Sequence, residues 1–87
     1  MAVKFVFLGR LADLAGTHEF ELTEADGEFD WTDLLAWLEV WSSPDLAAAV
    51  AGEKVRIAVN GALLGDKKAL SAMDGDEVAF LPPVSGG

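Results

Sequence analysis

The last six residues of the sequence are the part whose chemistry is easiest to recognise. They are Pro82, Pro83, Val84, Ser85, Gly86 and Gly87. Proline cannot donate a hydrogen bond to a sheet and favours extended backbone, so we expect regular structure to end at Leu81. Six extended residues reach roughly 20 Å, and serine and glycine add little width. The pattern predicts a narrow tail, residues 82–87, that can carry the carboxylate of Gly87 deep into another protein.

The composition excludes several other kinds of chemistry. The sequence has no cysteine, which rules out disulfides, thiolate metal sites and a cysteine persulfide. It has one histidine, His18, so we expect no metal site and place this residue on a strand edge without a catalytic role. The net charge of −9 makes nucleic acid and anionic membranes poor partners.

The acidic residues are unevenly distributed. Between Arg10 and Lys54 there is no lysine or arginine, whereas acids recur from Asp13 to Glu53. From Lys54 onward, acids and bases are balanced. One interpretation is a solvated surface that keeps the protein in solution. The other is that the acidic stretch steers the protein toward a basic partner, and the sequence leaves both open.

The length of 87 residues predicts one small domain, residues 1–81, followed by the tail. No apolar stretch is long enough to span a membrane, and the first residues do not resemble an export signal. We therefore expect a cytoplasmic protein.

Hydropathy and turn signals predict strands and helices in a definite order. Asp30 is a suitable N-cap for one helix, and Ser43 followed by Pro44 is typical of the start of another. Asn60-Gly61 is a strong hairpin signal. The expected strands cover residues 3–8, 18–22, 55–59, 62–64 and 77–81, and the expected helices cover 31–41 and 44–50, with single helical turns at 9–16 and 66–70.

The order of these elements favours one topology. Residues 3–8 and 77–81 are the most apolar strands, so we place them side by side at the centre of the sheet. Such a pair is parallel and requires a crossover, which the helix over 31–41 supplies. The sequence therefore predicts an α+β fold of the β-grasp, or ubiquitin-like, type: a mixed sheet of about five strands with a crossover helix on one face.

Three blocks of the sequence resemble a known family. The first has Val3, Phe5, Phe7, Arg10, Leu14 and Gly16, the second has Val59-Asn60 followed by Leu63, and the third runs from Asp74 to Gly87. Together they resemble the small, sulfur-carrier subunits of molybdopterin synthase over nearly the whole chain. Leu81 stands where relatives commonly have an aromatic residue. The three tryptophans of residues 31–41 match no feature of the family.

The resemblance implies that the protein is a reagent rather than a catalyst in its own right. In such families, a separate activating enzyme resembling ubiquitin-activating enzymes uses ATP to adenylate the terminal glycine, here Gly87. Sulfur from a persulfide then replaces AMP and gives a thiocarboxylate. The tail, with Gly86 kept bare for close approach, enters the large subunit of the synthase and donates sulfur to a pterin precursor. No cofactor is expected to be bound by the chain itself.

The resemblance and the tail also imply a partner-binding surface. We expect it to be apolar and to lie beside the tail, since exposed apolar patches on small proteins often mark interfaces. Arg10 can contact a partner or pair with an acid of its own chain, and Lys67 and Lys68 are expected to be solvated. The candidate residues for this surface are Leu63, Leu81, Pro82, Pro83, Val84, Ser85, Phe7 and Arg10.

Other functions fit the same sequence. The chain can be a sulfur carrier of another pathway, such as that of the thiamin thiazole, although those carriers are typically shorter and lack Pro-Pro-Val. It can be a protein modifier joined through Gly87 to lysines of target proteins. It can also be a β-grasp binding module whose tail is inert.

Overall fold

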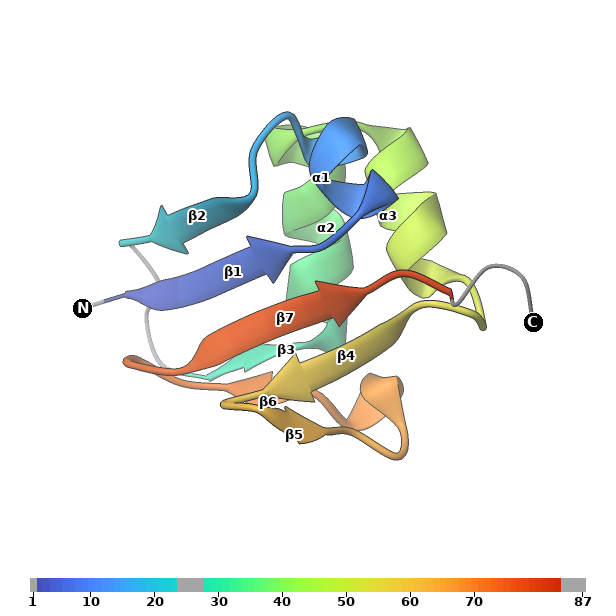
Figure 1. Ribbon diagram of the computed structural model, residues 1–87. Helices are drawn as coiled ribbons and strands as arrows, with labels where there is room; N and C mark the ends of the chain where they lie inside the picture. Colours follow the sequence, from blue (N-terminus) through green and yellow to red (C-terminus); the bar gives the residue numbers. More distant parts are fainter. Residues whose placement is uncertain (1, 24–27, 84–87) are drawn as a thin grey trace.

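The computed structural model describes residues 2–23 and 28–83, which form a mixed sheet with helices packed on one of its faces (Figure 1). The five-stranded sheet has the order β2-β1-β7-β4-β5. The elements are β1 (Val3–Phe7), α1 (Arg10–Ala15), β2 (Glu19–Leu22), β3 (Phe29–Asp30), α2 (Trp31–Trp41), α3 (Pro44–Ala51), β4 (Arg56–Val59), β5 (Ala62–Leu63), the 3-10 helix η1 (Lys67–Ala69), β6 (Ser71–Ala72) and β7 (Glu77–Leu81).

The first and last strands lie side by side at the centre of the sheet, as the sequence predicts. β1 pairs with β7 in parallel, with Phe5 opposite Val78 and Phe7 opposite Phe80. Both neighbours, β2 beside β1 and β4 beside β7, run antiparallel. The helices α1, α2 and α3 lie behind the sheet in Figure 1. The α+β, β-grasp fold with a crossover helix is therefore confirmed.

The two main helices begin where their capping residues indicate. The Asp30 carboxylate accepts a hydrogen bond from the backbone N–H of Asp33 at 2.9 Å, and the Asp33 carboxylate accepts from the N–H of Asp30 at 3.2 Å. Ser43 Oγ accepts from the N–H of Leu46, with Pro44 in the first turn of α3. These bonds satisfy N–H groups that have no partner inside the helix. None of the helices in the described parts of the chain is long and apolar enough to cross a membrane.

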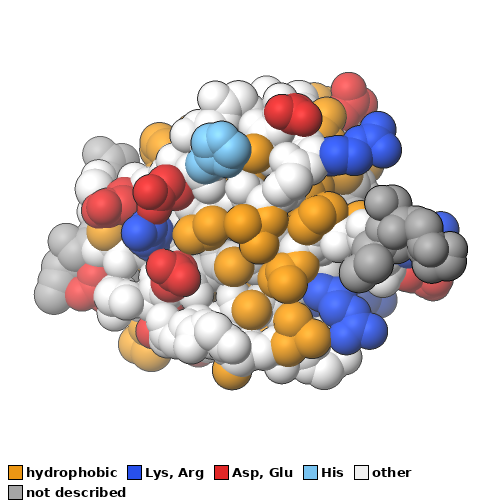
Figure 2. Space-filling view, in the orientation of Figure 1, with side chains coloured by type: hydrophobic (Ala, Val, Ile, Leu, Met, Phe, Trp, Pro, Cys, Tyr) orange, Lys and Arg blue, Asp and Glu red, His pale blue; other side chains and the backbone are white. Residues whose placement is uncertain are grey.

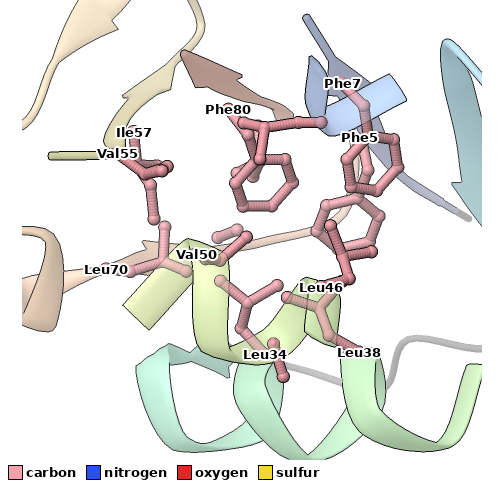
Figure 3. Packing of buried hydrophobic residues seen from close by; sticks show 14 of the residues in the cluster. Phe5, Phe7, Leu34, Leu38, Leu46, Val50, Val55, Ile57, Leu70 and Phe80 are labelled. Carbon is pink, nitrogen blue, oxygen red and sulfur yellow. The ribbon is translucent and has the colours of Figure 1, made fainter. Parts of the chain in front are cut away.

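The core lies between the helices and one face of the sheet (Figure 3). Phe5, Phe7 and Phe80 point from the strands toward Leu34, Leu38, Leu46 and Val50 of α2 and α3. The rings of Phe7 and Phe80 stack with centroids 5.1 Å apart. Phe7 is fully buried, so its placement on a partner-binding surface is wrong: its strand alternates, and the odd-numbered residues face the helices.

The tryptophans of α2 have a structural role that the sequence did not reveal. Trp37 and Trp41 stack on each other at 4.7 Å, and their rings also contact Phe5 and Phe7 at 4.7 and 5.6 Å. Both pack against Phe20 of β2 as well. Both remain half-buried, so they extend the aromatic core from the sheet to the surface of α2.

Two features differ from the sequence-based expectations. Phe29 and Asp30 pair with Ala72 and Ser71 as a separate two-stranded sheet, which is too short to leave a periodic pattern. Lys67, expected to be solvated, is half-buried: its ammonium donates to the carbonyls of Val50, Gly52 and Val55 near the end of α3.

Candidate functional site

The face of the sheet turned away from the helices is apolar at its centre (Figure 2). Its side chains come from the strand positions that alternate with the core residues and from Leu8, which directly follows β1. The register brings the strand residues together: Val6 lies opposite Ala79, and Ala79 opposite Ala58. We call this surface the outer face. It consists of Val6, Leu8, Ala58, Leu63, Ala79 and Leu81.

The outer face has no cover among the described residues of the chain. Leu63 is 49% exposed and Leu8 is 41% exposed, Val6, Ala79 and Leu81 are half-buried, and Ala58 is buried. Leaving apolar side chains in water forgoes about 25 cal/mol for each square ångström that a partner would bury. A contiguous patch of this kind is typical of an interaction surface.

The tail begins at one edge of the outer face. β7 ends at Leu81, where Arg56 of β4 lies opposite it, and Pro82 and Pro83 follow without regular structure. Pro82 packs against Gly9, whose φ is +56°. A Cβ at position 9 would lie 3.0 Å from Pro82 Cγ, so glycine is needed both for its backbone conformation and for this contact. The contact fixes the path of the chain where it leaves the sheet.

A hydrogen-bonded pair of turns fixes the other end of β7. The Asn60 side chain donates to Asp76 Oδ1 at 2.9 Å and accepts from the N–H of Glu77 at 2.9 Å. Asp76 Oδ2 also accepts from the N–H of Met73 at 2.8 Å. These donors, the Met73 N–H first and the Asn60 amide second, lower the pKa of Asp76. Asn60 and Gly61 both have positive φ, as the hairpin signal predicts.

The structure brings some of the predicted site residues together. Leu63 and Leu81 lie on the outer face, Pro82 and Pro83 lie at its tail end, and Arg10 is exposed at the start of α1. Phe7 is excluded by its burial. Val84, Ser85, Gly86 and Gly87 lie outside the described residues.

Sequence reasoning missed part of the surface. Val6, Leu8, Ala58 and Ala79 belong to it, and Arg56 borders it. Burial alternates along residues 3–8, and this alternation separates Val6 and Leu8 from the core residues. The sequence did not reveal it, because apolar residues occupy both faces of that strand.

Comparisons with known proteins agree on one family. The model of the ThiS family matches residues 5–87. The molybdopterin synthase sulfur carrier subunit of Escherichia coli K12 is 35% identical over 85 residues, which are 98% of this chain and 99% of that relative.

Solved structures of two relatives have the same fold. SAMP1 of Haloferax volcanii, a small archaeal modifier protein, superposes with a TM-score of 0.76 at 28% identity, with all of both chains covered. The second structure is the protein–protein complex of subunits 1 and 2 of the molybdopterin-converting factor of Helicobacter pylori. One chain of this complex superposes with a TM-score of 0.65 at 26% identity, with all of both chains covered.

Proposed function

The chain belongs to the ThiS family, and from this premise we propose that it is the sulfur carrier of a molybdopterin synthase. The observation that supports the proposal most strongly is the full-length match to a relative that bears this name, combined with an uncovered outer face beside the root of the Gly-Gly tail.

The proposed chemistry takes place at the carboxylate of Gly87. A carboxylate is a poor electrophile, so it first attacks the α-phosphorus of ATP in the activating enzyme and releases pyrophosphate. The resulting acyl-adenylate has AMP as its leaving group. The terminal sulfur of a persulfide attacks the carbonyl carbon and displaces AMP, and a thiol then cleaves the sulfur–sulfur bond, leaving a thiocarboxylate and a disulfide. Glycine at 86 and 87 leaves the carbonyl accessible during these attacks.

The outer face is the proposed docking surface in both steps. The activating enzyme and the large subunit of the synthase must each receive the same tail, so the surface beside its root faces both partners in turn. In the large subunit, the thiocarboxylate donates sulfur to a pterin precursor, and two such transfers complete one dithiolene. Pro82, held against Gly9, sets the direction in which the tail leaves the outer face.

Intact-mass spectrometry tests this proposal. The chain is incubated with the activating enzyme, ATP and a persulfide donor, and the expected result is a mass increase equal to the exchange of one oxygen for one sulfur. A variant lacking Gly87 is expected to fold normally and to transfer no sulfur, because each residue moves the reactive carbon by about 3.5 Å and an error of about 1 Å costs roughly 100-fold in rate. Gly86→Ala is expected to impair adenylation or transfer without loss of stability.

An unchanged mass of the wild-type chain, or wild-type transfer by the variant lacking Gly87, contradicts the proposal. An unchanged mass points instead to a binding module with an inert tail, whereas transfer by the variant shows that the chemistry does not depend on the carboxylate of Gly87.

A second candidate function is favoured by the likeness to SAMP1, a small archaeal modifier protein. In this role the activated carboxylate of Gly87 forms an isopeptide bond with a lysine of a target protein. Proteomic analysis of lysates that contain the tagged chain tests it: conjugates that disappear with the Gly87 deletion support a modifier, whereas free chain carrying a thiocarboxylate supports the carrier.

A further inference from the structure

A groove beside the root of the tail carries a concentration of positive charge. Its lining includes three basic residues, Arg10, Lys54 and Arg56, together with Gly9, Pro82 and Pro83. All three basic side chains are exposed. Half of the six lysines and arginines of the chain therefore meet at this one place, in a protein whose net charge is −9.

The geometry places these cations on both sides of the departing chain. Arg56 lies opposite Leu81 in the register of β4 and β7. Arg10 follows Gly9, which contacts Pro82. Figure 2 shows basic side chains at this end of the outer face.

Carboxylates of the same chain offset part of this charge: three basic and two acidic side chains leave the groove with a net charge of +1. Asp13 and Glu53 also line it, but the ion pairs found within the described residues join Lys4 to Glu19 and Glu77, at the opposite end of the sheet. Arg10, Lys54 and Arg56 have no ion pair within residues 2–23 and 28–83. Their charges are available to a partner.

We propose that this groove binds an acidic segment of the partner protein, whose aspartate or glutamate side chains flank the opening that receives the tail. The inference rests on the proposed function and adds the charge of the partner at the tail root. Arginine binds carboxylates through two parallel hydrogen bonds, so Arg10 and Arg56 fix the angle of docking, while the apolar outer face supplies the buried area. The angle at which the chain docks on its partner matters, because the tail must enter a narrow channel in one direction.

This assignment differs from one of the two interpretations that the sequence leaves open, in which the acidic stretch of residues 13–53 guides the chain to a basic partner. The charge next to the tail is positive, so the partner surface that meets it is negative. Salt slows association whether the partner surface is acidic or basic. Reversing the charge of one residue in the groove distinguishes an acidic partner surface from a basic one.

Stopped-flow association with the large subunit at low salt tests the charge. Arg56→Glu is compared with Lys68→Glu, which makes the same change in net charge at an exposed residue outside the groove. Arg56→Glu is expected to slow association about tenfold and to abolish its decrease with salt, whereas Lys68→Glu changes the rate less than about twofold. Equal effects of the two variants, or faster association of Arg56→Glu, overturn the proposal.

Carbodiimide cross-linking of the same complex provides a second measurement. This reagent joins an amine directly to a carboxylate with loss of water, so peptide mapping is expected to find Lys54 linked to an aspartate or glutamate of the large subunit. Lys54→Arg keeps the charge and is expected to bind normally while losing the cross-link. A complex that forms without any Lys54 cross-link overturns the inference and leaves the proposed function intact, whereas failure to form a complex at all contradicts the proposed function itself.

Discussion

The two faces of the central strands differ in environment although they are built from neighbouring residues. On the inner face, Phe5, Phe7 and Phe80 are fully buried beneath α2 and α3. On the outer face, Val6 and Leu81 are half-buried and no described element of the chain covers them. The inner face is buried within the chain and stabilises the fold, whereas the proposed function assigns the burial of the outer face to a partner protein.

The largest difference between the faces is expected in stability. Phe80→Ala removes a fully buried ring that stacks on Phe5 and Phe7, and it is expected to lower the free energy of unfolding by about 3–5 kcal/mol. Leu81→Ala, one residue further on, is expected to cost about 1 kcal/mol or less. Urea denaturation monitored by tryptophan fluorescence measures both. Similar losses for the two variants would show that the faces do not differ in this way.

The next difference is expected in binding. Leu81→Asp places a charge on the outer face beside the root of the tail and is expected to weaken binding to both the large subunit and the activating enzyme by about 10–100-fold. Val40→Asp is the matched control, because Val40 is 88% exposed on α2, away from the outer face. Isothermal titration calorimetry gives both affinities. Unchanged affinity of Leu81→Asp for both partners removes this residue from the interface.

The sequence predicted the inner face better than the outer one. Capping residues, the hairpin signal and the most apolar strands suffice to place α2, β4, β5 and the β1–β7 pair, because each depends on local chemistry or on burial. The outer face could not be read in the same way. Phe7 and Leu8 are both apolar, and only the three-dimensional register decides which of them faces the helices.

Contacts between distant segments were also invisible in the sequence. Lys67 is separated from α3 by a hairpin, yet its ammonium reaches the carbonyls of Val50 and Val55 at 2.8 and 2.9 Å. The side chain also lies over the ring of Trp31, at 5.7 Å from its centroid. Composition gave no sign of either contact, because a lysine in a polar turn is usually solvated.

A smaller effect is expected at Lys67, which belongs to the helical layer behind the inner face. Lys67→Met keeps most of the side-chain volume but leaves the carbonyls near the end of α3 without their donor. The expected loss is about 1–2 kcal/mol in the free energy of unfolding, with partner binding unchanged. Lys68→Met is the control, since Lys68 is exposed, and it is expected to have almost no effect. Thermal unfolding distinguishes the two variants. Equal melting temperatures of Lys67→Met and Lys68→Met would show that the Lys67 contacts do not stabilise the fold.

The smallest effect is expected at Asp76, at the end of β7 far from the tail. Because its pKa is lowered in the folded protein, ionised Asp76 favours folding at neutral pH, and this contribution is lost as the pH falls through the lowered pKa. Asp76→Asn is therefore expected to be slightly less stable than wild type at neutral pH and equally stable in acid. Urea midpoints measured from neutral pH to below about 4, the usual range of an aspartate, test this. A difference that does not change with pH would show that ionisation of Asp76 has no part in it.

The most direct test of the division between the two faces is methyl cross-saturation NMR on the complex with the large subunit. The chain is deuterated except for its methyl groups, and the protons of the large subunit are saturated. The account predicts signal loss at methyl groups of the outer face, Val6, Leu63 and Leu81, and none at Leu34, Leu46 and Val50 between the sheet and its helices. Signal loss concentrated on exposed methyl groups of α2, such as those of Val40, with the outer face unaffected, would contradict it.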